Sequence, residues 1–252
     1  MKYIIGDIGN TLTKISLLNN KFKIIKSHNV ETKKILSNKK INDVFNKYFS
    51  KQVNKNVLFS SVVPVAFKKI KVYLKKKYFN VYELKELELK KLIKFNVDKE
   101  KQVGSDRIAN VIGAYNKNNK DIIVIDFGTA TTFDIIKKNT TYIGGVIAPG
   151  INLSILNLNK ETALLPILKL KSNTKSYGKN TLDALNSGFL WGYQGLINNI
   201  IKKISSTSKN SYKVILTGGY AALFQKYIKM KSSVDQNITI KGIIKVYKEL
   251  LL

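Results

Sequence analysis

The sequence predicts an α/β protein made of two copies of one domain, and two observations carry this prediction. The first is an internal repeat, because residues 4–17 read I-I-G-D-I-G-N-T-L-T-K-I-S-L and residues 123–136 read I-V-I-D-F-G-T-A-T-T-F-D-I-I. Each segment is an apolar run, an Asp-x-Gly turn and a Thr-rich alternating run, which is the pattern of a strand hairpin. The second is that strands are followed by helices in both halves, as in sheets covered by helices.

The repeat also divides the chain. Asp7 aligns with Asp126 and Gly9 aligns with Gly128, at an offset of 119 residues. The polar segment N-K-N-N-K, Asn116 to Lys120, separates a helical stretch from the second hairpin and is the expected joint. We therefore expect an N-terminal half of residues 1–118 and a C-terminal half of residues 119–252.

Apolar spacing predicts the remaining elements of the first half. After the hairpin, strands are expected at residues 22–27 and 56–60, and helices at residues 41–49, 65–77 and 106–115. Ser105 or Asp106 stands where the N-cap of the last of these helices is expected.

The second half is predicted to contain a long helix with a stripe of small residues. Strands are expected at residues 143–147 and 214–216, the long helix at residues 180–204, and a further helix from Ala221. Small residues recur along the long helix at spacings of three and four: Ala184, Gly188, Gly192 and Gly195. Because Gly costs about 1 kcal/mol relative to Ala inside a helix, this stripe indicates close packing against another backbone.

The charge of the chain has two interpretations. The 252 residues include 44 Lys or Arg and 16 Asp or Glu, a formal net charge of +28, and Arg107 is the only arginine. Such an excess is typical of proteins that bind nucleic acids or membrane surfaces. It also results from AT-rich codon usage, which enriches Lys, Asn, Ile and Tyr. Since specific base recognition depends on the planar fork of Arg, we favour compositional bias and expect neither a nucleic-acid nor a membrane partner.

Composition also excludes several kinds of site. The chain has no cysteine, which excludes a disulfide, a thiolate metal site and a cysteine nucleophile, and its one histidine argues against a Ser-His-Asp triad. The apolar run before Asp7 is shorter than the roughly 7 to 15 residues of a signal-peptide core. No stretch approaches the roughly 20 apolar residues that cross a bilayer. A cytoplasmic protein is therefore expected.

The two Asp-x-Gly turns suit a site for phosphate and metal. Gly lets the backbone approach a phosphate, the following amides and hydroxyls donate to its oxygens, and the Asp faces a bound cation. A single Asp-x-Gly is also common in ordinary turns. Two equivalent copies, with T-G-G from Thr217 after a further strand, resemble the nucleotide site of the actin, hexokinase and Hsp70 superfamily. That resemblance implies duplicated ribonuclease-H-like domains with ATP in the cleft between them.

Within this superfamily the chain resembles the type III pantothenate kinases. The resemblance covers nearly the whole chain and rests on eight motifs in the family's order. They are D-I-G-N-T from Asp7, S-S-V-V-P from Ser60, G-S-D-R from Gly104, D-F-G-T-A-T-T from Asp126, G-G-V-I-A-P-G from Gly144, T-A-L-L-P from Thr162, G-K-N-T from Gly178 and T-G-G from Thr217.

The resemblance implies that ATP phosphorylates the primary hydroxyl of pantothenate, the first committed step towards coenzyme A. It implies ATP with Mg²⁺, with Asp7 near the Mg²⁺, and a monovalent cation, K⁺ or NH₄⁺, held by Asp126. The implied ATP-binding residues are Asp7, Ile8, Gly9, Asn10, Thr11, Leu12, Thr13, Lys14 and Thr129. The implied substrate-binding residues are Gly104, Ser105, Asp106, Arg107 and Thr181. The family is dimeric, so a homodimer is expected.

Chemistry supports two of these residues independently. Phosphoryl transfer to an alcohol uses a group that accepts the hydroxyl proton, and Asp106 is the candidate general base. The alternative for an Asp at this position is a helix N-cap. Arg107 has the alternative of a surface residue. A chain that uses Lys everywhere else keeps its one Arg here, which indicates a guanidinium fork for a carboxylate or a phosphate.

The chain departs from the family at one place. Members usually carry Tyr-x-x-Pro shortly before G-x-D-R, and the matching positions here are Val97 and Glu100. This departure keeps open a kinase for another small hydroxylated substrate. A separate alternative is a non-catalytic ATP-binding relative that acts as a regulator or binds nucleic acid.

Overall fold

Both predicted hairpins form. Strand β1 (Lys2–Ile8) pairs antiparallel with β2 (Leu12–Leu18), and β7 (Asp121–Phe127) pairs antiparallel with β8 (Ala130–Lys137). The computed structural model describes residues 1–252 except 50–51, 116–119, 173–175 and 209–210. Most of the expected joint, Asn116 to Lys120, thus lies outside the described residues.

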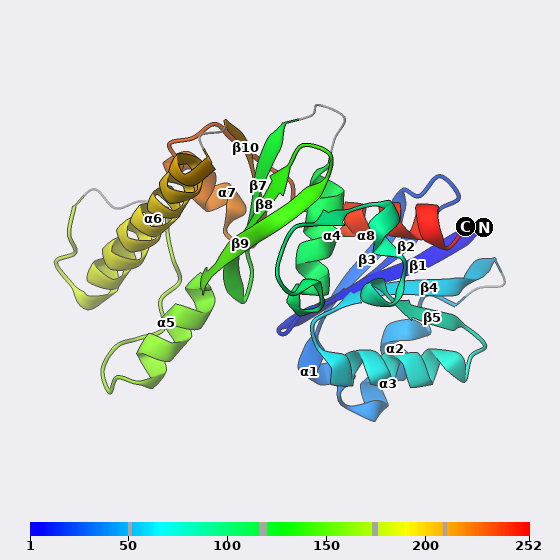
Figure 1. Ribbon diagram of the computed structural model, residues 1–252. Coiled ribbons are helices and arrows are strands. Elements are labelled where there is room, and N and C mark those ends of the chain that lie inside the picture. The colour runs from blue at the N-terminus through cyan, green and yellow to red at the C-terminus, as the bar shows by residue number, and fades with distance from the viewer. Residues whose placement is uncertain (50–51, 116–119, 173–175, 209–210) are drawn as a thin grey trace. The chain divides into compact units, whose positions relative to one another are not determined.

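Contacts group the chain into two compact units. Unit 1 contains residues 1–116, 140–142 and 237–252, and unit 2 contains residues 117–139 and 143–236. The repeat divides the chain at residues 118 and 119, whereas by contact the C-terminal helix α8 (Ile238–Leu250) belongs with unit 1. The reason is that α8 packs along α4 (Ser105–Ala114), as Figure 1 shows.

The sheet of unit 1 has the order β3-β2-β1-β4-β5. Strand β3 (Ile24–Glu31) is antiparallel to β2, while β4 (Val53–Ser61) is parallel to β1 and β5 (Asn80–Glu83) is parallel to β4. Strand β3 thus starts and ends later than the predicted strand at 22–27, and β5 was not predicted. The short β6 (Lys94–Phe95) pairs with Thr141 and Tyr142, which unit 1 includes.

Helices cover both faces of this sheet. One face carries α1 (Thr32–Ile35), α2 (Asn38–Phe45) and α3 (Pro64–Lys75) over a core that includes Ile4, Phe45 and Phe59. The other carries α4 and α8, which contact β1 and β4. Three 3₁₀ turns lie between β5 and α4: η1 (Leu84–Glu86), η2 (Leu89–Lys91) and η3 (Glu100–Gln102).

The sheet of unit 2 repeats this arrangement. From one edge the strands are β11 (Ser232–Val234), β10 (Tyr212–Gly218), β7, β8 and β9 (Thr141–Pro149), with β10 and β11 parallel as β4 and β5 are. The duplicated fold that the repeat predicts is therefore confirmed in its strand order and in the direction of these pairs.

Helices of unit 2 pack against its sheet over one apolar core. They are α5 (Ile151–Lys160), α6 (Thr181–Ser208) and α7 (Ala221–Phe224), which a 3₁₀ turn, η4 (Gln225–Tyr227), extends. The long helix predicted at 180–204 is thus present and longer. Among the described residues no helix is both long and apolar enough to span a bilayer.

Candidate active site

Three polar side chains end neighbouring parallel strands of unit 1. Asp7 is the last residue but one of β1, Ser60 lies beside it in register on β4, and Glu83 closes β5. Since the carboxyl ends of parallel strands meet at one sheet edge, these groups lie along the same edge. Ser60 is fully buried, and its hydroxyl has no hydrogen-bond partner among the described atoms. The buried Ser60 hydroxyl is thus a polar neighbour of Asp7 at this edge.

The turn between β1 and β2 is held by a residue that sequence reasoning missed. Buried Thr32, the first residue of α1, donates its hydroxyl to the Gly9 carbonyl at 2.6 Å and its amide to the Thr11 carbonyl at 2.9 Å. Its hydroxyl also lies 2.9 Å from that of Thr13. A Thr after a β-rich stretch carries no local signal for this role, because its partners are about 20 residues away.

The implied ATP-binding residues of this turn differ in how far their side chains are exposed to solvent. Ile8 and Thr13 are fully buried, so their side chains shape the turn from inside. Asn10, Thr11 and Leu12 are exposed at its tip, with Asp7, Gly9 and Lys14 half-buried. The Lys14 ammonium group donates to Asn237 at 3.2 Å. Polar groups are therefore presented to solvent at the tip, while the hydroxyl of Thr13 is turned towards Thr32.

The N-terminus of α4 brings G-S-D-R together, although its cap is not the one predicted. Gly104 is the N-cap, and neither Ser105 nor Asp106 caps the helix, so that prediction is wrong. The hydroxyl of buried Ser105 instead donates to the Glu83 carboxylate, and Asp106 lies in the first turn. Asp106 is therefore not the N-cap residue, although its Oδ1 accepts from the Arg107 amide within the first turn of α4.

Burial governs the electrostatics of Asp106. Desolvation raises the pKa of its carboxyl group, while the Arg107 amide, which donates to Oδ1 at 2.8 Å, and the charges of Arg107 and Lys85 act in the opposite direction. A carboxylate with a raised pKa is a stronger base than one in water. Perturbed carboxyl groups of this kind are common at functional sites.

The Arg107 side chain lies over an aromatic ring, which distinguishes it from an ordinary surface residue. Its half-buried guanidinium group is 5.8 Å from the ring centre of Tyr142, which is itself buried. The Phe95 ring packs edge-on against Tyr142 at 6.3 Å. A planar guanidinium stacks on such a face better than an ammonium group does. This geometry agrees with the expectation from composition that position 107 needs a guanidinium group.

In unit 2, glycines allow three segments to meet around Asp126. A Cβ on Gly218, whose φ is +84°, would lie 2.7 Å from the Asp126 carboxylate and 2.6 Å from the Phe127 carbonyl. A Cβ on Gly150, the N-cap of α5, would overlap the Thr129 carbonyl. The half-buried Asp126 and exposed Thr129 thus lie beside the T-G-G motif and a helix N-terminus, an arrangement suited to anions and their counter-cations.

Thr181 lies in unit 2 as the exposed first residue of α6. It lines a groove of about 670 Å³ between α5 and α6 together with Ala184, Gly188 and Gly192. A Cβ on Gly188, Gly192 or Gly195 would meet nothing within 4 Å among the described atoms. The close backbone packing predicted for this stripe is therefore not made within the described chain.

Solved structures show the fold class. Inorganic polyphosphate/ATP-glucomannokinase from Arthrobacter sp. strain KM is similar with a TM-score of 0.53 and 13% identity, over 98% of this chain and 97% of that one. A Campylobacter jejuni protein described as belonging to the Baf family of transcriptional activators is similar with a TM-score of 0.58 and 21% identity, over 98% of both chains. Duplicated sheets with polar hairpin turns define a protein of the actin and hexokinase fold class.

Sequence comparison gives the family. The model of the type III pantothenate kinase family matches residues 3–203. A type III pantothenate kinase of Pelagibacter ubique strain HTCC1062 is 48% identical over 246 residues, which cover 96% of this chain and 97% of that one. The chain belongs to the type III pantothenate kinase family.

The glycine at position 218 yields a prediction about stability. Gly218→Ala would force a side chain into positive φ and against two oxygens, so we expect it to lower the free energy of unfolding by about 1–3 kcal/mol. The matched control is Gly219→Ala, because a Cβ there would lie 4.0 Å from its nearest neighbour, the Phe127 carbonyl. Urea unfolding followed by circular dichroism measures both, and equal effects of the two variants would contradict the prediction.

Proposed function

We propose that the chain transfers the γ-phosphoryl group of ATP to the primary hydroxyl of pantothenate, with Asp106 as the general base. The carrying observation is the position of Asp106, in the first turn of α4 rather than at its N-cap, with a carboxyl group whose pKa is raised by burial. Family membership supports the substrate, and the kinase-like fold supports the use of ATP with a metal ion. The cytoplasm is the proposed compartment.

In the proposed mechanism Asp106 takes the proton of the hydroxyl as its oxygen attacks the γ-phosphorus. Phosphoryl transfer demands mainly alignment and neutralisation of charge, so one placed carboxylate is a sufficient proton acceptor. Burial raises the pKa of Asp106 and brings it nearer to neutral pH, which favours the proton transfer. The Arg107 amide that donates to Oδ1 fixes the carboxyl orientation.

We assign ATP binding to the segment Asp7 to Lys14 and to Thr129. The exposed Asn10 and Thr11 would donate hydrogen bonds to phosphate oxygens, while Ile8 and Thr13 hold the shape of the turn. Asp7, beside the buried hydroxyl of Ser60, would hold Mg²⁺. No group of three or more His, Cys, Asp or Glu among the described residues could hold a metal ion, so phosphate oxygens or water would complete its ligands.

The bound Mg²⁺ would neutralise charge on the phosphates. Asp126 would hold the monovalent cation, K⁺ or NH₄⁺. The support for this assignment is the space at Gly218, where the absence of a side chain leaves the Asp126 carboxylate accessible.

The substrate would be bound by Gly104, Ser105, Asp106 and Arg107, with Thr181 as a further contact. Arg107 is the group suited to the carboxylate of pantothenate, because its fork can donate two parallel hydrogen bonds. Val97 and Glu100 replace the Tyr-x-x-Pro of other members, so a phenol hydrogen bond is absent from those positions. This difference favours keeping a kinase for another small hydroxylated substrate as the second candidate.

The first test is turnover, read as ADP release with pantothenate, simple sugars and acetate as acceptors in K⁺ buffer. We expect pantothenate alone to be phosphorylated, and Asp106→Asn to lower kcat by about 10²–10⁴-fold with ATP binding retained, since that is the usual contribution of a general base. Asp98→Asn, which changes an exposed carboxylate eight residues earlier in the chain, is the control. A folded protein that leaves pantothenate unchanged would overturn the proposed function.

Replacement of the single arginine tests its role. We expect Arg107→Lys to lower kcat/KM for pantothenate by about tenfold or more, because Lys keeps the charge but loses the bidentate fork and the stacking on Tyr142. KM for ATP should change little. Lys85→Arg is a suitable control for a charge-preserving exchange in the same unit, and an unchanged kcat/KM in Arg107→Lys would refute the assignment.

We also propose a homodimer formed through the α5–α6 groove. The groove is lined by apolar and small residues, and Leu153, Leu156 and Leu182 on these helices are 41–51% exposed. Glycines with open space above them let a second backbone approach closely. Large exposed apolar surfaces are typical of interaction sites.

The oligomeric state is measurable by sedimentation velocity. The wild-type protein should sediment at twice the chain mass of 28.5 kDa, and Gly188→Leu, which fills the groove, should shift it to the monomer. Lys203→Leu, on an exposed position of the same helix, should leave the dimer intact. A wild-type monomer at micromolar concentration would contradict the proposal.

A further inference from the structure

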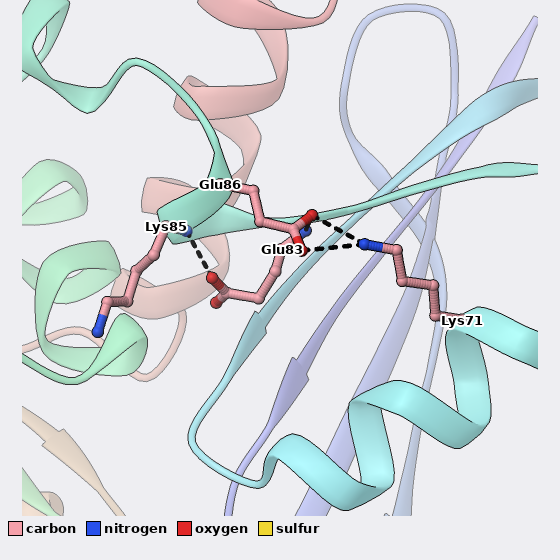
Figure 2. A network of polar contacts seen from close by, with 4 residues as sticks. All are labelled: Lys71, Glu83, Lys85 and Glu86. Atoms are coloured by element: carbon pink, nitrogen blue, oxygen red, sulfur yellow. Dashed lines mark hydrogen bonds and ion pairs between the residues drawn. The ribbon is translucent and has the colours of Figure 1, made fainter. Parts of the chain in front are cut away.

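Glu83 connects three segments of unit 1 through one carboxylate. Oε1 accepts from the Ser61 amide at 3.3 Å and from the Ser105 hydroxyl, and Oε2 accepts from the Lys85 amide at 2.7 Å. Figure 2 shows Glu83 at the end of β5 with its bond to Lys85. Two of these donors belong to motifs of the family, S-S-V-V-P and G-S-D-R, whereas Glu83 belongs to none of the eight motifs.

Further contacts, through Glu86 and Lys71, hold Glu83 in place. It is the N-cap of η1 and forms a capping box with Glu86, whose Oε2 accepts from the Glu83 amide at 3.2 Å. The ammonium group of Lys71 on α3 in turn contacts both carboxylate oxygens of Glu86, at 2.9 and 3.0 Å. The position of the Glu83 carboxylate is therefore fixed by backbone and side-chain contacts before it meets Ser105.

The contact with Ser105 fixes the start of α4. Ser105 is fully buried and precedes Asp106, so the orientation of its hydroxyl fixes the backbone from which the Asp106 carboxylate projects. A Cβ on Gly104 would approach Oδ1 of Asp106, which shows how little room this carboxylate has. A shift of the helix end would therefore move Asp106 directly.

The Glu83 carboxylate has the hydrogen-bond donors that a buried charge needs. Burial raises the pKa of its carboxyl group, and the hydrogen bonds from Ser105, Lys85 and Ser61 act in the opposite direction, so the donors offset part of the cost of burying a charge. Hydrogen bonds to a charged acceptor are stronger than those between neutral groups. One carboxylate can thus hold the strand end and the helix start together.

We propose that Glu83 is a positioning residue that holds the N-terminus of α4 through Ser105 and so aims Asp106 at the substrate hydroxyl. This inference rests on the proposed function, because it assigns a role relative to the proposed general base. Glu83 makes no contact with substrate in this account. A misplacement of about 1 Å can cost roughly 100-fold in rate, so its effect should appear in kcat.

The central experiment places Glu83→Ala in two backgrounds. In the wild-type background we expect kcat to fall between about tenfold and about 100-fold, with KM for ATP within about twofold. In the Asp106→Asn background the residual turnover should change less than about twofold, because nothing remains for Glu83 to aim. Glu88→Ala, which removes an exposed carboxylate five positions after Glu83 in the same connecting segment, should leave kcat unchanged.

Two further variants identify the route of the effect. Ser105→Ala should reproduce the loss, and Glu83→Ala combined with Ser105→Ala should be no worse than the more affected single variant. Glu83→Gln keeps an acceptor oxygen for Ser105 and should retain more activity than Glu83→Ala. It also serves as the variant to use if Glu83→Ala does not fold.

Hydrogen exchange gives a reading that does not depend on turnover. The Ile108 amide donates to the Gly104 carbonyl at 3.1 Å, so loosening of the first turn of α4 should speed its exchange in Glu83→Gln and leave the amides of α8 unchanged. Wild-type kcat in Glu83→Ala, equal losses in both backgrounds, or unchanged exchange at Ile108 would each overturn the inference. Failure of the proposed function would appear separately, in the wild type and in Asp106→Asn alone.

Discussion

The backbone contact between α4 and α8 is the constraint on which unit 1 depends. A Cβ on Gly113 would overlap the Ile238 carbonyl, and a Cβ on Gly242 would overlap the Ala109 carbonyl. The two helices approach this closely only because both positions are glycine. A hydrogen bond from Thr239 to Asn110, at 2.7 Å, lies inside the same contact. The last helix of the chain thereby fixes the axis of the helix that carries Asp106.

The two units use the same hairpin but hold it differently. Asp7 has Ser60 as its parallel neighbour and Asp126 has Thr217, so each carboxylate lies beside a hydroxyl-bearing residue at its strand end. In unit 1 the turn is held by the side chain and amide of Thr32. In unit 2 it is held by the close approach of glycine backbones at positions 150 and 218. Duplication thus preserved the sheet while the supports of the two turns diverged, which is consistent with separate roles for Asp7 and Asp126.

The lysines that form ion pairs and the single arginine lie in different environments. The ion pairs of the described residues mostly involve exposed side chains, and such pairs contribute roughly 0–1 kcal/mol each. Arg107 is half-buried over the ring of Tyr142. The interpretation of the +28 charge as compositional bias stays a prediction. Arg107, by contrast, lies where its guanidinium group faces the Tyr142 ring.

The sequence by itself determined the hairpins, the repeat and the family motifs, because these depend on residues that are neighbours along the chain. Tertiary structure decided the rest. Thr32 contacts Gly9 in the first turn at a sequence separation of 23 residues, and Glu83 contacts Ser105 at a separation of 22 residues. Helix α8 reaches α4 across 129 residues. The N-cap of α4 is Gly104, and the hydroxyl of Ser105 donates to the distant Glu83 carboxylate instead. Periodicity and local propensity contain no information about partners that only the packed chain brings together.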